Sequence, residues 1–451
     1  PIGVKLRLAR RGSVRFLAQM HNRASTRPAD QFAELLGRLP SGLDLDALAR
    51  QTCAIQRRRA LCDGGTLLRL ALARGPGGLS LKQTAAWAEL IGLAHMSDPA
   101  IKYRLDKAVP FLKSIMDALL TAHADARTLH WPGRILRAVD GTHVNQPGST
   151  GTDWRIHAAF DLGRGGFSHL ELTDKHGAES VERGAPVPGE VRICDRNFAS
   201  APALHRFRTQ SGSQADFVVR ARWKSFRLTR SDGASFNLIE HLKTLPVDDH
   251  PQEVLVQAKL GGGDHLPLRL IILRRPAEIA EQIRKRLKRQ APRKQKTVHP
   301  NSLVAAEFLI LATSLAAEGY KAEEILAAYR LRWQIELAFK RLKSLLHIDR
   351  LPARTPQASR SWLYAHLILA LLVDDISQGL LDSSPSGPAR RGVSALALDP
   401  AGHRLPLLGQ ARTRAALAPP PHPGRTQRPS PPRQLTAKAK APSLLSPAAL
   451  I

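Results

Sequence analysis

Four side chains in the stretch Tyr329–Lys343 have the types and spacing to act together on a charged substrate. The stretch reads YRLRWQIELAFKRLK and contains no glycine or proline, so it predicts one helix of four turns. At about 100° per residue, Tyr329, Arg332, Glu336 and Lys343 fall within roughly 60° of one another. The opposite face carries five apolar residues that are predicted to pack inward: Leu331, Ile335, Ala338, Leu342 and Leu345. A carboxylate framed by cations suits work on nucleic acid, and a plain solvated helix face is the simpler alternative.

Two aspartates are each predicted to stand at the end of a β-strand. Arg134–Val139 reads as a short strand that ends at Asp140, and Val191–Cys194 reads as another that ends at Asp195. Carboxylate oxygens are the ligands that Mg²⁺ and Mn²⁺ prefer. Two such ions can activate an attacking water or 3′-hydroxyl and stabilise the leaving oxygen of a phosphodiester. With Glu336 as the third carboxylate, the pattern predicts a site for two Mg²⁺ or Mn²⁺ ions, whereas each aspartate alone is more often a turn former.

The cations near these carboxylates are predicted to hold phosphates. Phosphoryl transfer depends mainly on positioning and on charge stabilisation, so the site needs groups that grip the neighbouring backbone. Four residues are candidates for such contacts: Tyr329, Arg332, Lys343 and Arg196.

The region before residue 131 is predicted to be helical. Residues 1–28 are rich in arginine without periodicity and predict a flexible basic arm, and residues 29–130 predict a helical DNA-binding domain. Ser80 is expected to cap a helix that ends near Leu93, and Ser97 to open a second helix that ends near Leu120. Two helices joined by a tight turn could form a helix-turn-helix that reads DNA, and a plain helical bundle is the alternative.

From residue 131 onward the pattern predicts an α/β (α+β) fold. Residues 131–222 read as consecutive strands of one mixed sheet, residues 223–305 as a β-rich insertion, and residues 306–380 as a buried strand followed by helices. Within the insertion, Arg284–Lys296 carries eight cations in thirteen residues, which predicts a basic loop against a phosphate backbone or, alternatively, an ordinary solvated run. Residues 381–451 are rich in proline and lack periodicity, so they predict a disordered tail.

Charge and cysteine usage restrict the partners and the compartment. The 451 residues carry a formal net charge of +29, which favours a nucleic acid partner over a membrane surface; the alternative explanation is the high arginine content that a GC-rich genome produces. No apolar run reaches the 18 residues of a membrane span. The three cysteines form no CxxC pair, which favours a reducing cytoplasm and disfavours a zinc site.

The spacing Tyr329-x2-Arg332-x3-Glu336-x6-Lys343 resembles the signature of bacterial transposases of the insertion-sequence-four family. The segment AVDGTHV around Asp140 is similar to the first catalytic aspartate of that family, and ICDRNFAS around Asp195 is similar to the second. The gap of 141 positions between Asp195 and Glu336 is similar to the family's wide gap, which holds a β-rich insertion. The likeness covers roughly residues 30–380.

This resemblance implies an RNase H-like catalytic domain, interrupted by the insertion, with Asp140, Asp195 and Glu336 as a metal-binding triad. It implies DNA nicking at transposon ends and strand transfer into target DNA by the freed 3′-hydroxyl. Tyr329, Arg332 and Lys343 would contact DNA, and the N-terminal helices would bind terminal inverted repeats. It also implies a bacterial, nucleoid-associated cytoplasmic protein that acts as a homodimer. Two alternatives remain at this point: a catalytically inactive DNA-binding remnant, and an RNase H-like nuclease without strand transfer.

Overall fold

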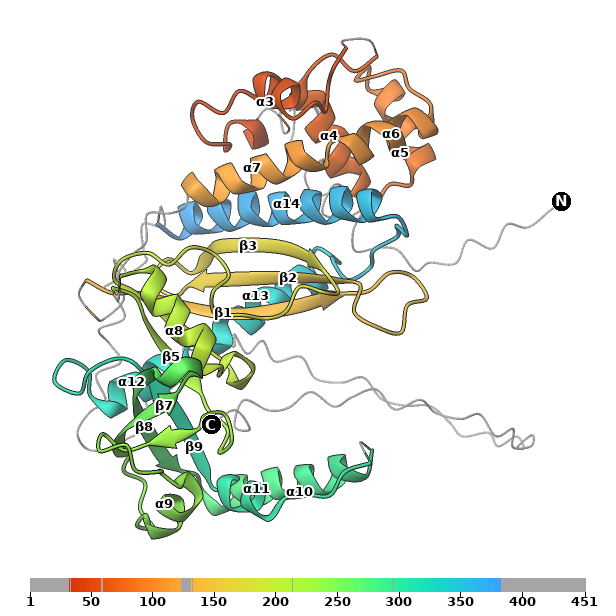
Figure 1. Cartoon of the computed structure of the whole chain (residues 1–451). Coiled ribbons are helices and arrows are strands. Elements are labelled where there is room, and N and C mark those ends of the chain that lie inside the picture. The colour runs from red at the N-terminus through yellow and green to blue at the C-terminus, as the bar shows by residue number, and fades with distance from the viewer. Residues whose placement is uncertain are drawn as a thin grey trace, which may run out of the picture. The chain divides into compact units, whose positions relative to one another are not determined.

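The structure is a computed structural model that describes residues 32–382, apart from residues 33, 58, 59, 123–130, 132, 213 and 294 (Figure 1). The predicted basic arm of residues 1–28 lies outside the described part, and so does the predicted tail beyond residue 382. Within the part that is described, none of the helices combines the length and the hydrophobicity that a membrane span needs.

Helices α3 to α7 make up the region before residue 123. Their bounds are Leu45–Gln51 (α3), Gly64–Arg74 (α4), Leu81–Leu90 (α5), Asp98–Lys107 (α6) and Val109–Ala122 (α7). Ser80 caps α5 as predicted: it exchanges hydrogen bonds with Gln83 in a capping box, and α5 ends three residues earlier than expected. The single helix predicted after Ser97 is wrong, because Pro110 has no amide proton and its ring disfavours a continuous helix, so α6 ends and α7 begins around Ala108.

A nine-stranded mixed sheet forms the rest of the framework, in the order β3-β2-β1-β4-β5-β9-β8-β7-β6. Its first five strands are Ile135–Val144 (β1), Trp154–Asp161 (β2), Gly166–Asp174 (β3), Glu190–Cys194 (β4) and Asp216–Arg220 (β5). β1 pairs antiparallel with β2 and parallel with β4, and β4 pairs parallel with β5. Two short helices follow β4, η1 (Arg196–Phe198) and α8 (Ala201–Gln210). The mixed α/β class and the RNase H-like sheet expected from the sequence are confirmed.

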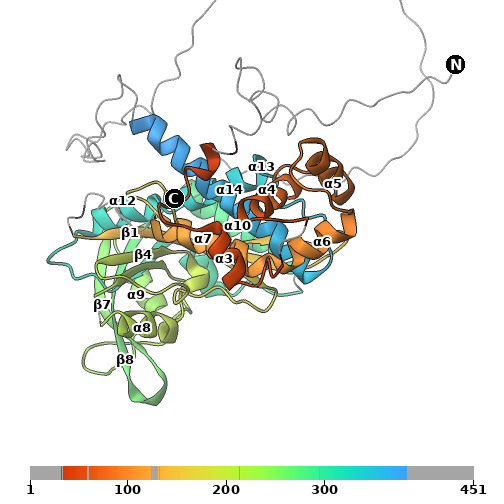
Figure 2. The same ribbon diagram turned by 90° about the horizontal axis from the view of Figure 1, so that it is seen from above.

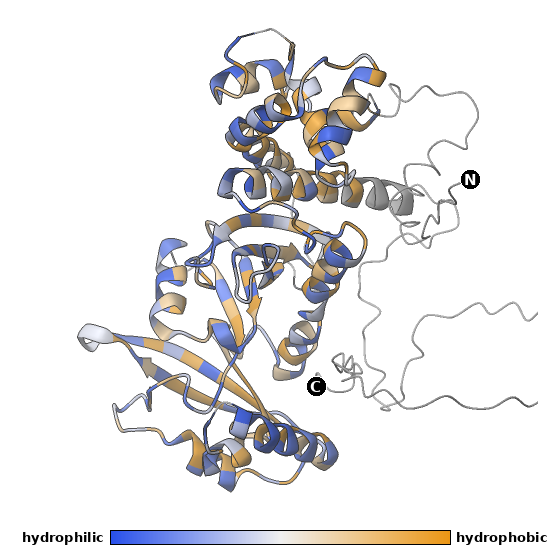
Figure 3. Cartoon of the chain, turned by 90° about the vertical axis from the view of Figure 1, so that its right-hand side faces the viewer, coloured by the Kyte–Doolittle hydropathy of each residue, from blue (hydrophilic) through white to orange (hydrophobic). Residues whose placement is uncertain are grey.

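The strands of the range 223–305 extend this same sheet. They are Leu228–Thr229 (β6), Gln252–Lys259 (β7) and His265–Arg274 (β8), and β9 (Phe308–Thr313) joins them to β5. The range also contains α9 (Leu238–Thr244), η2 (Gly261–Gly263), α10 (Ala277–Arg293) and α11 (Pro300–Ala305). The basic loop predicted at Arg284–Lys296 is therefore wrong for most of its length, because these residues belong to α10. Apolar residues at helical spacing, among them Ile283 and Leu287, give α10 one face to pack, and its many Lys, Arg and Gln residues are good helix formers. Figure 3 shows α10 at the lower edge, largely hydrophilic.

The two faces of the sheet pack against different helices. Successive residues of a strand point to opposite faces. Accordingly Ala138 of β1 joins the core that includes Ile335, while the next residue, Val139, joins the core that includes Leu204 of α8. Asp140 is one step further along β1, so its side chain shares the face of Ala138.

The stretch Tyr329–Lys343 is not one helix. It divides into α12 (Ala322–Arg330) and α13 (Trp333–Ser344), with a turn at Leu331 and Arg332. α12 buries Ile325 and Tyr329 in one core, whereas α13 buries residues such as Ile335 in another, so tertiary packing overrides local helix propensity. Of the five apolar residues expected to pack inward, Ile335, Ala338 and Leu342 are buried, Leu331 is half-buried and Leu345 is 72% exposed.

The long helix α14 (Pro356–Asp382) packs beside α7 and also contacts α4 and α6 (Figures 1 and 2). Its buried residues, among them Leu367 and Leu371, share one core with Leu67 of α4 and Phe111 of α7. The same core continues onto β1, β2 and β3, so the N-terminal helices and the sheet are joined through α14.

Candidate active site

The register of two parallel strands brings Asp140 and Asp195 together. The last paired residues of β1 and β4 are Val139 and Cys194, so Asp140 and Asp195 are the next residues on neighbouring strands. Neighbouring strands lie about 5 Å apart, and both aspartates fall on the same face of the sheet. One expectation is wrong: β1 does not end at Asp140 but continues to Val144, because β2 still pairs with it there. Only the pairing with β4 stops at this point.

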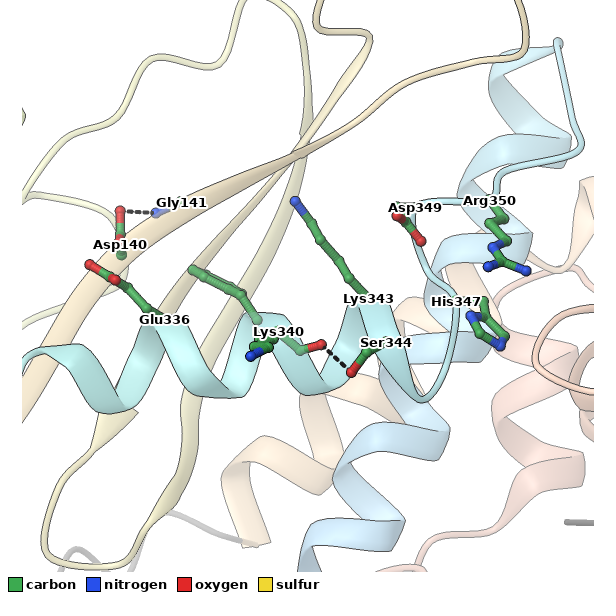
Figure 4. A pocket seen from close by; sticks show the side chains of 10 residues that line it. Asp140, Gly141, Glu336, Lys340, Lys343, Ser344, His347, Asp349 and Arg350 are labelled. Atoms are coloured by element: carbon green, nitrogen blue, oxygen red, sulfur yellow. Dashed lines mark hydrogen bonds between the residues drawn. The ribbon is translucent and has the colours of Figure 1, made fainter. Parts of the chain in front are cut away.

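Glu336 reaches the same place from the first turn of α13. Ile335 and Ala338, on either side of it, pack into the core that holds Ala138 of β1. This packing fixes α13 across β1 and turns Glu336 toward Asp140, as Figure 4 shows. The Glu336 side chain is 43% exposed and that of Asp140 is 23% exposed, so both carboxylates can be reached from solvent.

Arg332 lies between these carboxylates. Its Nη1 donates to Asp140 Oδ2 at 3.4 Å, and its Nη2 donates to Glu336 Oε1 at 2.5 Å. Arg332 is only 8% exposed; burial acts to lower the pKa of its guanidinium, but Tyr329, Glu336 and Asp195 outweigh burial and raise this pKa above its ordinary value. The turn between α12 and α13 therefore places one guanidinium among all three predicted metal ligands. We expected Arg332 to contact phosphate, and here its partners are protein carboxylates.

Tyr329 is buried at the end of α12. Burial raises the pKa of its phenol, and the charges of Arg332 and Arg220 oppose that rise. Tyr329 as a whole is 7% exposed, and its neutral hydroxyl lies beside the Arg332 guanidinium. In this arrangement Tyr329 helps to hold Arg332.

The electrostatics of Asp140 reveal a carboxylate that sequence reasoning missed. Burial raises the pKa of Asp140 to about 6, and the charges of Glu179 and Glu336 add to the rise, against the Gly141 amide and Arg332. Glu179 lies directly over Gly141, where an added Cβ would stand 3.1 Å from Glu179 Oε1. Glu179 follows β3 in an irregular segment, with no strand end or helix face to mark it. The glycine after Asp140 is the only signal, since it leaves room for a close neighbour.

A groove of about 720 Å³ runs from Asp140 and Glu336 along α13 (Figure 4). Lys343, predicted as a phosphate contact, lines it, and burial lowers the pKa of its ammonium group. Three further residues that could carry positive charge line the same groove and were not predicted: Lys340, His347 and Arg350. The groove therefore leads from two carboxylates past these four groups, which suit phosphate, and past the carboxylate of Asp349.

A second group of cations surrounds the other side of Asp195. Arg196 begins η1, directly after Asp195, and burial together with the like charges of Arg220, Arg222 and Arg286 lowers its pKa. Arg286 belongs to α10, so this basic cluster (Arg196, Arg220, Arg222 and Arg286) connects the basic helix to the site. Four mutually repelling cations favour the binding of an anion between them.

The donor set suits a hard divalent cation. Asp140, Asp195 and Glu336 offer only carboxylate oxygens, which Mg²⁺ and Mn²⁺ prefer. Among the residues that the structure describes, no three Asp, Glu, His or Cys side chains are arranged closely enough to hold a metal ion as they stand. The Arg332 guanidinium donates to oxygens of Asp140 and Glu336 that a metal ion would also use.

Comparison with known proteins agrees with this geometry. Residues 131–372 match the family model described as a transposase DDE domain. The chain is 39% identical to the InsL transposase of insertion sequence element IS186A from Escherichia coli (strain K12), over 79% of this chain and 96% of the relative. It is equally similar to the transposase of element IS421 from Escherichia coli, with the same coverage, and 32% identical to that of element IS231F from Bacillus thuringiensis subsp. israelensis, over 59% of this chain and 62% of the relative.

Among solved structures, the cryo-EM structure of the piggyBac transposase synaptic complex with hairpin DNA aligns with 77% of this chain and 75% of its own, with a TM-score of 0.38 and 11% identity. The family match spans more than half of the chain, from β1 to α14, and includes every residue of the site described above. Proteins with this domain generally use divalent metal ions. The chain belongs to the DDE transposases of bacterial insertion sequences, as the spacing of its Tyr, Arg, Glu and Lys residues suggested.

Proposed function

We propose that this transposase binds the terminal inverted repeats of its element and cuts and joins DNA with Asp140, Asp195 and Glu336 as ligands of two Mg²⁺ or Mn²⁺ ions. The observation that carries this assignment is the convergence of three elements. The β1–β4 register places the two aspartates side by side, and α13 turns Glu336 toward Asp140. When bound, the metal ions would supply an activated water or 3′-hydroxyl and stabilise the leaving oxygen.

The chain's own residues position the DNA. Lys343 and its neighbours in the groove bind phosphates next to the scissile bond, and the basic cluster around Arg196 binds them on the other side. The exposed cations of α10, which include Lys285 and Arg289, extend this surface away from the site. This positive surface extends beyond the three carboxylates and can therefore contact the phosphates of a long DNA duplex on both sides of the cut.

The N-terminal helices are proposed to bind the inverted repeats. Residues 91–97 connect α5 to α6, and α6 presents Tyr103, which is 58% exposed. Arg104 and Lys107 lie against this ring, at 6.0 and 5.9 Å from its centroid. An exposed aromatic ring flanked by cations suits contact with a nucleic acid. Because two DNA ends must be joined, we propose that a homodimer acts on the nucleoid in the bacterial cytoplasm.

The test is to replace each carboxylate by its amide, in Asp140→Asn, Asp195→Asn and Glu336→Gln. Each variant should lose cleavage of a duplex with the element's ends by at least about a thousandfold, because a metal ligand is lost, while binding of that duplex is retained. Mg²⁺-dependent nicking on a labelled duplex measures cleavage, and a gel-shift assay measures binding. Glu318→Gln is the matched control: it lies exposed between β9 and α12 and should cleave like the wild type.

Two outcomes would overturn the proposal. If any of the three variants cleaves like Glu318→Gln, that carboxylate is not a metal ligand. If the wild type cuts the ends but yields no joined product with target DNA, the protein is a nuclease without strand transfer. A wild type that binds the ends without cutting them would be the inactive remnant.

A further inference from the structure

We propose that Arg332 is an internal counter-cation of the active site, which competes with the divalent metal ions for Asp140 and Glu336. This inference rests on the proposed function, because it takes these carboxylates as metal ligands. In this role Arg332 is a positioning residue: it holds the two carboxylates before the protein contacts DNA.

The contacts of Arg332 carry the inference. Both terminal nitrogens of its guanidinium donate to triad carboxylates, Nη1 to Asp140 and Nη2 to Glu336. The groups that face it from other elements are Tyr329 at the end of α12 and Asp195 after β4, a neutral phenol and a further anion. No described cation other than Arg332 forms an ion pair with Asp140 or Glu336.

Burial distinguishes Arg332 from a cation that is accessible to a DNA phosphate. It is 8% exposed, whereas Arg341, on α13, is exposed to solvent. A phosphate can reach the Arg332 guanidinium only after that group has left the carboxylates. Its position at the turn between α12 and α13 allows such a movement, because the side chain does not lie in the middle of a rigid helix.

The charges of the site couple metal binding to DNA binding. The charges of Glu336 and Glu179 repel that of Asp140, and the single positive charge of Arg332 offsets this repulsion. A divalent ion that takes the same oxygens provides more charge but must first displace the guanidinium, so Arg332 weakens metal binding in the absence of DNA. A DNA phosphate that accepts the displaced guanidinium removes this competition. Metal and DNA should then bind cooperatively.

The experiment is calorimetric titration of Mn²⁺ into the full chain without DNA, at one pH and one ionic strength. Arg332→Gln should bind Mn²⁺ about tenfold more tightly than the wild type, because a competing charge is gone. Arg332→Lys keeps the charge and should stay within about threefold of the wild type. Arg341→Gln removes the same charge from an exposed position of α13 and should not change the affinity.

Equal or weaker Mn²⁺ binding by Arg332→Gln overturns the inference, since the guanidinium would then only hold the carboxylates in place. Asp140→Asn separates this failure from a failure of the proposed function. If Asp140→Asn binds Mn²⁺ as the wild type does, the metal site itself is misassigned. If it loses binding while Arg332→Gln gains none, only the role of Arg332 is wrong.

A second measurement needs no variant and covers the case in which Arg332→Gln fails to fold. An arginine-specific reagent such as phenylglyoxal, read by peptide mass spectrometry, reports the accessibility of each guanidinium in the wild type. Mn²⁺ should increase the modification of Arg332 severalfold and leave Arg269 unchanged, because Arg269 is 4% exposed and pairs with Glu253 far from the triad. Unchanged modification of Arg332 at saturating Mn²⁺ contradicts displacement.

Discussion

Asp140 illustrates, at the scale of single residues, how strand register selects the group that reacts. The sequence marks it only as a carboxylate after an apolar run, and its importance comes from the residue beside it on β4. Asp140, Asp195 and Glu336 could all be named from the sequence, because strand ends and helix faces leave a pattern. The pairing of Arg332 with two of them could not, since it depends on a turn that local propensity does not produce.

The raised pKa of Asp140 predicts how the site responds to pH. Burial raises this pKa from 3.8 to about 6, so the folded protein favours the protonated side chain. Neutral Asp140 therefore stabilises the fold fully below pH 3.8, and this contribution is lost as the pH rises through about 6. Metal binding requires the ionised form and should weaken as the pH falls through about 6. The Mn²⁺ affinity of the wild type, measured without DNA between pH 5 and 8, should show this inflection. A flat wild-type profile would contradict the raised pKa.

At the scale of elements, packing decides where helices begin and end. The strands of the catalytic sheet could be predicted within a few residues, because each is a short apolar run bounded by turn residues. The turn at Leu331 could not, because it arises where α12 and α13 enter different cores. The helix α10 was missed because its charges hid the apolar spacing of Ile283 and Leu287.

The contact between α3 and α4 gives a prediction at this scale. A Cβ added at Gly64, the first residue of α4, would stand 2.3 Å from the carbonyl oxygen of Leu45. Gly64→Ala must therefore separate the two helices and strain the bond from the Gly64 amide to Asp46 Oδ1. We expect it to lower the free energy of unfolding by about 2–3 kcal/mol. Gly151→Ala, where nothing lies within 4 Å of the added Cβ, should change it by less than about 0.5 kcal/mol. Urea unfolding measures both, and equal midpoints for the two variants would refute the close contact.

At the scale of the whole molecule, the chain carries a formal net charge of +29. From this charge the sequence predicted a polyanionic partner, and DNA is a polyanion of that kind, since the chain is a DNA transposase. It could not indicate which cations act together. The fold does so, because it brings Arg286 of α10 beside Arg196, which lies 90 positions earlier in the chain.

The basic helix α10 predicts the salt dependence of DNA binding. Lys285, Arg286 and Arg289 are exposed, and replacing all three by Gln should lower the slope of log affinity against log salt by about 2–3, at about 0.9 per phosphate contact. The matched control removes three cations that pair with Asp117, Glu182 and Glu240, namely Lys113, Arg206 and Lys243. Its slope should stay within about 0.5 of the wild type. Filter binding at several salt concentrations measures both, and identical slopes would show that α10 does not contact DNA.

The position of α14 has a consequence for gene expression. The ribosome makes α3 to α7 first, but the apolar residues of α4 and α7 that face α14 stay uncovered until residues 356–373 have left the exit tunnel. A message that stops before residue 356 would therefore yield helices with an open core, which are prone to aggregation and proteolysis. We therefore expect premature termination of this reading frame to leave the N-terminal helices without a stable core.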